Sequence, residues 1–435
     1  MVGRRAPRVH RAGVGATVAR AWLPLAHDIG RGALRHLGGR DRSPRRPSFA
    51  EWEGEPSFSD ATRVIGRPPG TLLASAPMRL VGGGGANRVT ATRMEYVTTD
   101  ARGHTITATG AYLHSHRPWR GGTRPVVAFA PSTQGVAPHC DPSYSMSVGM
   151  SVTLRGPADI VASYELPAIT AMLAAGMHVV LTDYPRDPDV GWQLYCDHPS
   201  CGNALLDAVR AARHLGLPAR APVGLWGFSQ GAAAVGKALE DGDHAPDVRP
   251  VAAVVAAPPS RLDEVLAHVD GSLVTGVLSY AVAGLLVVSP EIRSEILGAL
   301  TPEGLDHVTA DLGTCAVSSV FTSGWRSTSR WTRAGVPLGE LLDDLPHVSA
   351  EFDARMLGRR APQVPVLLWG SLHDDVVPVA QVRALRDDWR AGGADVTWFE
   401  DRSPKVPGRT GANHFGPYYR HLTRNVGWLI DELRR

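Results

Sequence analysis

The feature that most constrains the fold is an alternation of apolar runs with amphipathic segments in the middle of the chain. Four runs read as strands: residues 125–130, 178–183, 222–227 and 251–256. Helical patterns separate them, at residues 166–175, 202–215 and 230–239. Strands that are apolar throughout are buried on both faces, which is typical of a parallel sheet covered by helices. The sequence therefore predicts an α/β domain.

The alternation stops after residue 257 and resumes near residue 364. Residues 258–360 carry mostly helical segments punctuated by Gly and Pro. A second strand–helix–strand–helix series follows, at residues 364–370, 378–390, 395–400 and 418–433. A helical insertion within one sheet domain is the simplest account of this order, because 435 residues exceed what a single core usually needs.

We therefore expect four regions along the chain. They are a basic, weakly structured tail (1–50), the first part of the α/β core (51–257), a helical cap or lid insertion (258–350) and the second part of the core (351–435). In the first part of the core, residues 88–99 and 105–113 have the composition of two strands, and the turn 100–103 joins them as a hairpin. Ahead of them, the Pro-rich residues 56–80 are expected to wrap around the core.

The net charge of +3 is located in the tail, where eleven arginines stand against two aspartates in residues 1–46. The remainder of the chain is slightly acidic, and this excludes a nucleic-acid-binding body. The tail lacks the apolar run of a secretory signal. Its apolar residues follow a helical stripe, which is compatible with an amphipathic helix at a membrane surface. We favour a weakly structured tail, or a translation start downstream of Met1.

An uncharged apolar stretch at residues 271–289 has almost the length of a membrane span. Ser272, Thr275, Ser279 and three glycines dilute it, and folded sequence surrounds it. We therefore interpret it as a buried or lid helix, with a membrane span as the alternative.

The strongest chemical motif is Gly227-Phe228-Ser229-Gln230-Gly231, between a strand and a helix. This is the setting of a nucleophile elbow, in which a serine occupies a tight strand-to-helix turn. The glycines leave room for neighbouring backbone, and the helix N-terminus presents N–H groups to a developing oxyanion. Ser229 is therefore the predicted nucleophile of an α/β-hydrolase fold.

A serine hydroxyl needs a base, and in this fold the order along the chain is Ser, acid, His. Asp374 and Asp375 both follow the strand 364–370; we select Asp374 and expect Asp375 to cap the turn or the helix beyond Pro378. His414 lies after the last predicted strand and before the last predicted helix, and is the predicted base.

The oxyanion requires two N–H donors. One should be the backbone N–H of Gln230, which follows the nucleophile. The other should come from the loop after the first buried strand, where Thr133 is the first choice and Gln134 the second. An ordinary Gly/Pro turn is the alternative for this loop.

The four cysteines, Cys140, Cys196, Cys201 and Cys315, show no CxxC spacing and no zinc pattern. An even count fits two disulfides in an exported protein, and Cys196 and Cys201 flank a turn that could close as a small loop. Four reduced, buried thiols are the alternative.

These signatures together resemble the secretory lipase family of the α/β-hydrolase superfamily, which includes the fungal lipase A type and actinobacterial relatives. The resemblance covers roughly residues 56–430. Its motifs occur in family order: Pro69 to Leu73 with Ser75 and Pro77, Tyr96 to Asp100, Pro131 to Gly135, Cys140 to Tyr144, Gly227 to Gly231, Asp374 to Pro378, and His414.

The resemblance implies a lipase or carboxylesterase that hydrolyses triacylglycerol-like esters without a metal or organic cofactor. It implies a helical cap over an acyl pocket, a disulfide from Cys140 to Cys315, and Cys196–Cys201 as the second. The expected partner is a lipid or ester substrate, encountered at a lipid–water interface, with no nucleic acid and no stable protein partner. The expected location is extracellular or the cell envelope, with a cytoplasmic location left open.

Overall fold

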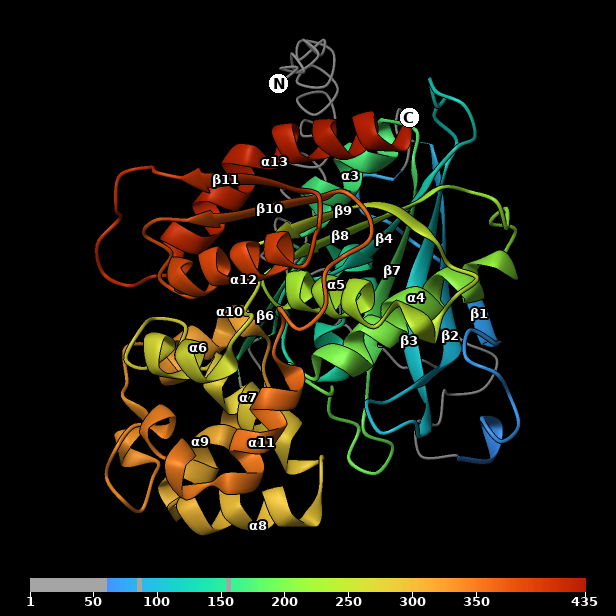
Figure 1. The fold of residues 1–435 in the computed structure, drawn as a ribbon. Coiled ribbons are helices and arrows are strands. Elements are labelled where there is room, and N and C mark those ends of the chain that lie inside the picture. The colour runs from blue at the N-terminus through green and yellow to red at the C-terminus, as the bar shows by residue number, and fades with distance from the viewer. Residues whose placement is uncertain (1–60, 84–87, 154–157) are drawn as a thin grey trace.

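The computed structural model describes residues 61–83, 88–153 and 158–435. The predicted tail and the start of the Pro-rich segment lie outside these residues. Within them, nine strands form one twisted sheet in the order β1-β2-β3-β7-β4-β8-β9-β10-β11 (Figure 1). The strands from β7 to β11 pair in parallel, and β1, β2, β3 and β7 pair antiparallel. The expected α/β-hydrolase fold is confirmed.

The strand bounds agree closely with the apolar runs. They are β1 Leu72–Met78, β2 Val89–Thr99, β3 Thr105–Ser115, β4 Val126–Ala130, β7 His178–Pro185, β8 Val223–Phe228, β9 Pro250–Ala256, β10 Val366–Ser371 and β11 Val396–Asp401. Every residue of β4, β7, β8 and β10 is buried. The uninterrupted apolar runs therefore mark the strands that are covered on both faces.

Helices cover both faces of this sheet. On one face lie α4 (His198–Arg213), α5 (Gln230–Glu240) and α12 (Val379–Ala391), and on the other lie α3 (Leu166–Ala174) and α13 (Ala412–Leu433) (Figure 1). Alternate residues of β8 enter the two cores, with Leu225 in the first and Trp226 in the second. This period of two is the ordinary strand pattern.

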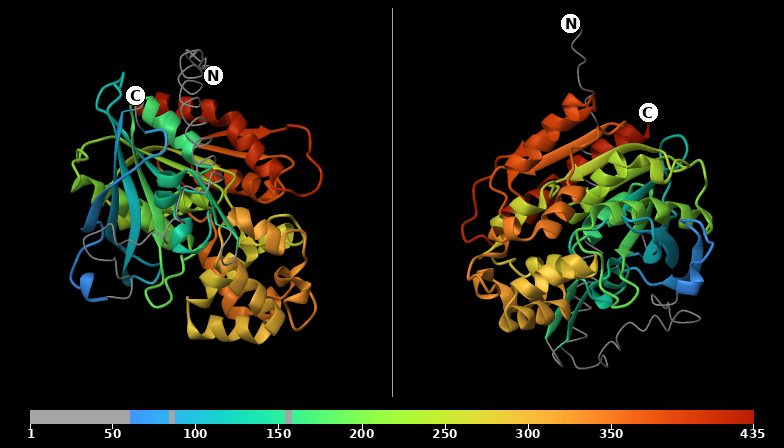
Figure 2. Two further views of the ribbon diagram at one scale, coloured as in Figure 1. Left: turned by 180° about the vertical axis from the view of Figure 1, so that it is seen from behind. Right: turned by 60° about the horizontal axis from the view of Figure 1, so that its bottom comes forward.

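Between β9 and β10 the chain forms six α-helices. They are α6 Leu262–Val269, α7 Val277–Leu286, α8 Pro290–Ala299, α9 Pro302–Leu312, α10 Ala316–Ser323 and α11 Pro346–Arg355. They gather on one side of the sheet domain, in yellow and orange in Figures 1 and 2, around a core of their own. The apolar stretch 271–289 contains α7, which is largely buried there. None of the helices in the described ranges is both long and apolar enough to span a bilayer.

Three local expectations need correction. Residues 72–78, expected only to wrap, form the edge strand β1; Pro77 is compatible with that position because an edge strand leaves one side unpaired. A short hairpin of β5 (Met150–Thr153) and β6 (Asp159–Ala162) was not predicted. The last helix begins at Ala412, not at residue 418, because Gly416 and Pro417 are accommodated inside α13.

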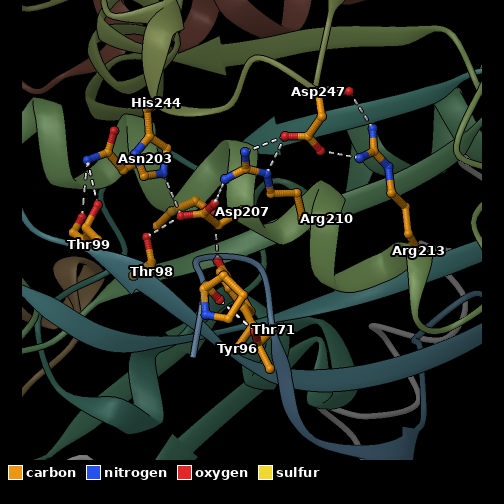
Figure 3. Close-up of polar contacts among 12 residues, drawn as sticks. Thr71, Tyr96, Thr98, Thr99, Asn203, Asp207, Arg210, Arg213, His244 and Asp247 are labelled. Atoms are coloured by element: carbon orange, nitrogen blue, oxygen red, sulfur yellow. Dashed lines mark hydrogen bonds and ion pairs between the residues drawn. The ribbon is translucent and has the colours of Figure 1, made fainter. Parts of the chain in front are cut away.

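A buried polar cluster attaches α4 to the antiparallel edge of the sheet (Figure 3). Asp207 on α4 accepts hydrogen bonds from Thr98 Oγ1 (2.9 Å) and Arg210 Nη1 (2.9 Å) and pairs with His244 Nε2 (2.8 Å). Arg210 also donates to Asp247 (2.8 Å from Nε). Since Asp207 is fully buried, these partners compensate the loss of water around its carboxylate.

Candidate active site

Ser229 occupies the turn between β8 and α5. Its backbone has φ 55° and ψ −123°, a left-handed conformation that a non-glycine residue rarely adopts. Its N–H donates to Ala256 O on the neighbouring strand β9 (2.9 Å). Strain of this kind costs of order 1–3 kcal/mol and persists only where the surroundings impose it. The turn thus has the geometry of a nucleophile elbow.

The two glycines of the motif are required by space. A Cβ on Gly227 would lie 2.1 Å from Gly231 O, and a Cβ on Gly231 would lie 2.0 Å from Ala130 O at the end of β4. Both contacts are with backbone, which cannot move aside. The elbow therefore packs directly against the loop that follows β4.

His414 and Asp374 form a buried pair. His414 Nδ1 lies 2.8 Å from Asp374 Oδ2 and 3.0 Å from Oδ1. His414 is in the first turn of α13, not in a loop ahead of the helix as expected. Its Nε2 atom is buried and has no hydrogen-bond partner among the described residues. Since His414 and Ser229 line the same cavity, this nitrogen is available for a reacting group there.

The two neighbouring aspartates have different partners. Asp374 Oδ1 accepts from the N–H groups of Val376 (2.9 Å) and Val377 (2.8 Å), which fixes its carboxylate toward His414. Asp375 Oδ2 accepts from Gly411 N (3.0 Å) and Asn413 Nδ2 (3.1 Å). The expectation that Asp375 caps the turn or helix beyond Pro378 is therefore wrong: it holds the start of α13, which carries His414.

The loop after β4 places Thr133 in the cavity wall, together with Ser132. The N–H of Ser132 is already used, because it donates to Glu165 Oε1 (2.8 Å). Neither the N–H of Thr133 nor that of Gln230 donates to any described residue. Gln134, the second choice, does not line the cavity. The two residues predicted to supply the oxyanion donors, Thr133 and Gln230, thus both line the cavity and have N–H groups without an acceptor among the described residues.

Glu165 forms hydrogen bonds with this loop. The sequence did not lead us to predict this role. It is fully buried, and its carboxylate accepts from the Ser132 N–H and hydroxyl and from Tyr418 OH (3.0 Å). Burial raises the pKa of Glu165, and the Ser132 hydrogen bonds partly oppose that shift. No local pattern marks Glu165, because its partners lie 33 and 253 residues away.

A cavity of about 360 Å³ joins these groups to the inserted helices, a volume in the usual range of small-molecule sites. Its polar end contains Ser229, His414 and Thr133. The rest of its wall is mainly aliphatic and comes from α6, α7, α10 and α11: Leu262, Val265, Leu266, Val277, Leu278, Ala281, Ala316, Val317, Val320 and Phe352. The inserted helices thus face the carboxyl ends of β4 and β8.

One predicted disulfide is present and the other is not. Cys140 and Cys315 are bonded, which joins the segment after the Thr133 loop to the start of α10. Cys196 and Cys201 are both free and buried, so the predicted second disulfide is wrong. Cys201 lies in the first turn of α4 with Sγ directed at Leu194 O (3.6 Å), whereas Cys196 lines the cavity. Closeness in sequence did not produce a disulfide bond here.

Among the described residues, one group of potential metal ligands is close enough to share an ion: His139, Cys140, Asp159 and Cys315. Both sulfurs belong to the disulfide, and a disulfide sulfur is not the thiolate that a metal site uses. His139 Nε2 pairs with Asp159 Oδ2 at 2.7 Å. The cluster is explained by these contacts.

A family model described as Secretory lipase matches residues 155–434, more than half of the chain. The chain belongs to the secretory lipase family. The resemblance seen in the sequence is thereby confirmed, and membership supports a carboxylic ester hydrolase that acts on a lipid or ester substrate. The family description also indicates an exported protein.

Two relatives carry names that differ in whether the protein is described as catalytically active. A probable inactive lipase of Mycobacterium tuberculosis is 29% identical over 382 residues, which cover 81% of each chain. A secreted triacylglycerol lipase of Malassezia globosa is 25% identical over 272 residues, which cover 60% of this chain and 54% of that one. The chain thus spans about half the length of this fungal relative.

Solved structures match the fold over most of the chain. Candida antarctica lipase A in its closed state has a TM-score of 0.70 at 18% identity and covers 87% of this chain and 94% of its own. The rice cell wall degrading esterase LipA from Xanthomonas oryzae has a TM-score of 0.67 at 17% identity, with 84% and 100% covered. At these identities the comparison establishes the architecture.

Proposed function

We propose that this member of the secretory lipase family is an active serine hydrolase of acyl esters. Ser229 is the nucleophile, His414 the base and Asp374 the acid that orients it. The observation that carries the proposal is the pairing of His414 Nδ1 with Asp374 at 2.8 Å, which leaves a buried Nε2 atom without a partner beside the cavity of Ser229.

In the first half-reaction, His414 Nε2 takes the proton of the Ser229 hydroxyl while Ser229 Oγ forms a bond to the ester carbonyl carbon. Asp374 stabilises the imidazolium and holds its orientation without itself taking the proton. The N–H groups of Gln230 and Thr133 stabilise the oxyanion, each by about 3 kcal/mol by analogy with measured oxyanion donors. The intermediate then breaks its bond to the alcohol oxygen, which receives the proton from His414.

In the second half-reaction, His414 takes a proton from water, and the resulting hydroxide attacks the acyl carbon. Collapse of the intermediate breaks the bond to Ser229 Oγ, which recovers its proton from His414. An alcohol in place of water would give acyl transfer by the same steps. Hydrolysis is the reaction that the family description supports.

The aliphatic cavity wall favours a lipid acyl chain, as in a triacylglycerol, over a small polar acyl group. We propose that residues 258–350 form a helical insertion that caps the acyl site. The other proposed regions are the tail 1–50 and the two parts of the α/β core, 51–257 and 351–435. We further propose action outside the cell or in its envelope. A general carboxylesterase for short acyl chains is the second candidate, because the cavity is modest in volume.

A catalytically inactive, lipid-binding protein is a separate candidate, which the name of the mycobacterial relative raises. A fluorophosphonate probe distinguishes the two proposals, because it reacts covalently only with an activated serine. We expect stoichiometric labelling, and peptide mass spectrometry should locate the adduct on Ser229. Ser147→Ala, which changes a serine of α2 (Pro142–Val148) outside the cavity, should label like the wild type. Absence of labelling on folded wild-type protein would favour the inactive candidate.

A further inference from the structure

The aliphatic cavity contains one permanently charged side chain. Arg355, the last residue of α11, belongs to its wall, and no Asp, Glu or Lys of the described residues does. Arg355 is only 1% exposed. Burial of an arginine is rare unless its charge is paired, and it is unnecessary in a pocket that takes only hydrocarbon.

The pairing of Arg355 is incomplete. Its Nε donates to Glu351 Oε1 (2.9 Å), and Nη2 lies 2.9 Å from the same oxygen without hydrogen-bond geometry. Neither Nη1 nor Nη2 donates to a described residue. A guanidinium carries five N–H donors, so part of its capacity is unused.

The negative charge of Glu351 is shared between Arg355 and a second arginine. Its other carboxylate oxygen, Oε2, lies 3.8 Å from Arg102 Nη2, so two arginines share one glutamate. Glu351 and Arg102 lie outside the cavity wall, and their side chains are 17% and 40% exposed. Of the three side chains in this group, only that of Arg355 belongs to the cavity wall.

The backbone and neighbours fix Arg355 in place. Its carbonyl oxygen lies 3.1 Å from Nδ1 of the buried His198 on α4. Burial raises the pKa of the Cys196 thiol, which lines the same cavity, to about 12, and the Arg355 guanidinium acts in the opposite direction. Arg355 and Cys196 both belong to the wall of this cavity.

We propose that Arg355 binds a carboxylate at the far end of the acyl chain, so that half-esters of dicarboxylic acids are substrates of this site. This inference rests on the proposed ester hydrolysis and deepens it. The ester carbonyl reaches Ser229 while the free carboxylate pairs with the guanidinium, whose parallel N–H groups match its two oxygens. The aliphatic wall holds the methylene groups between them.

The test compares matched esters. The p-nitrophenyl half-esters of dicarboxylic acids from succinate to sebacate are measured beside p-nitrophenyl esters of unsubstituted acids with the same number of carbons. The measured quantity is the ratio of kcat/KM for the anionic ester to that for the neutral ester. In the wild type this ratio should peak at one chain length, the one that spans Ser229 to Arg355.

Three variants separate recognition from structural support. Arg355→Met should lower the ratio at its peak by about tenfold or more, since a charged hydrogen-bonded pair is lost. Glu351→Gln should raise it several-fold, because it frees the guanidinium. Arg359→Met, the matched control at an exposed arginine outside the cavity wall, should leave it within about twofold. If the Arg355–Glu351 pair served only stability, the first two variants would move the ratio in the same direction, and the proposal would be wrong.

A binding measurement keeps this proposal distinct from the proposed function. In Ser229→Ala protein, monomethyl suberate and methyl octanoate are compared by thermal shift. A larger shift with the suberate that disappears in Ser229→Ala/Arg355→Met supports the Arg355 site, even if the wild type hydrolyses no ester. Equal shifts in both proteins would contradict it.

Discussion

His414 Nδ1 lies 2.8 Å from Asp374 Oδ2, although the two residues are 40 positions apart, Asp374 in the loop after β10 and His414 in α13. Two separate anchors produce this contact. The N–H groups of Val376 and Val377 hold Asp374, and Asp375 holds the beginning of the helix that carries His414. The adjacent aspartates therefore have different roles: Asp374 orients the proposed base, and Asp375 stabilises the start of α13.

Substitution of each aspartate tests this division. Asp374→Asn should lower kcat by about 10⁴-fold with the fold retained, because the imidazole loses its orienting carboxylate. Asp375→Asn should lower the free energy of unfolding by about 1–3 kcal/mol, since it weakens the hydrogen bonds to Gly411 and Asn413. Ester kinetics and denaturant titration of both variants measure the two effects. A larger loss of kcat in Asp375→Asn would reverse the assignment.

The elbow glycines should tolerate no side chain. Gly231→Ala places a Cβ about 2.0 Å from Ala130 O, so we expect insoluble protein or a loss above about 3 kcal/mol. Gly242→Ala, where a Cβ would meet nothing within 4 Å, is the control and should stay within about 1 kcal/mol of the wild type. Thermal unfolding of both variants gives the comparison. A Gly231→Ala protein as stable as the control would contradict the packing described for the elbow.

The oxidation state of the cysteines can be counted directly. In denaturant without reductant, thiol titration should find two free thiols per chain, from Cys196 and Cys201, and four after reduction. In the native protein both thiols should react slowly, because burial raises their pKa and blocks access. A count of zero in denaturant would restore the Cys196–Cys201 disulfide.

Acid should destabilise the protein through His198. Burial lowers the pKa of this fully buried imidazole from 6.5 to about 3, and the positive charges of Arg355 and Lys237 act in the same direction. A histidine whose pKa is lowered by folding contributes stability above its unfolded pKa and loses it as the pH falls toward the folded value. Between pH 7 and pH 4 the loss from this group amounts to about 3 kcal/mol.

Denaturant unfolding at pH 7 and pH 4 measures that loss. His198→Asn should show a smaller drop in unfolding free energy than the wild type, by about 3 kcal/mol. His214→Asn, which changes the exposed histidine at the other end of α4, should follow the wild type. Identical drops in the wild type and His198→Asn would exclude His198 as the source.

Much of the fold was predictable because its signals are local. The apolar runs of β4 and β8 reflect burial on both faces, and the elbow motif is complete within five residues. Chain order and the preceding strand restricted the predicted acid to Asp374 and Asp375, of which Asp374 was selected. Patterns of this kind appear in a single stretch of sequence, since each element must satisfy its own periodicity.

What was missed depends on contacts between distant residues. Glu165 could not be recognised without its hydrogen bond from Tyr418, and Arg355 could not be recognised without its place in the cavity wall. The Cys196–Cys201 disulfide was inferred from proximity in sequence, but both cysteines are free thiols, and of the two only Cys196 belongs to the cavity wall. The edge strand β1 was not recognised because Pro77 lies within it and two prolines precede it; its pairing is decided by β2 and not by its own composition.

The most direct test of the central claim is hydrolysis of a p-nitrophenyl ester series from acetate to palmitate by the wild type and by Ser229→Ala. The account predicts turnover by the wild type that peaks at medium or long chains and falls by several orders of magnitude in Ser229→Ala. Near-normal hydrolysis in the folded Ser229→Ala protein would contradict the assignment of Ser229 as the nucleophile.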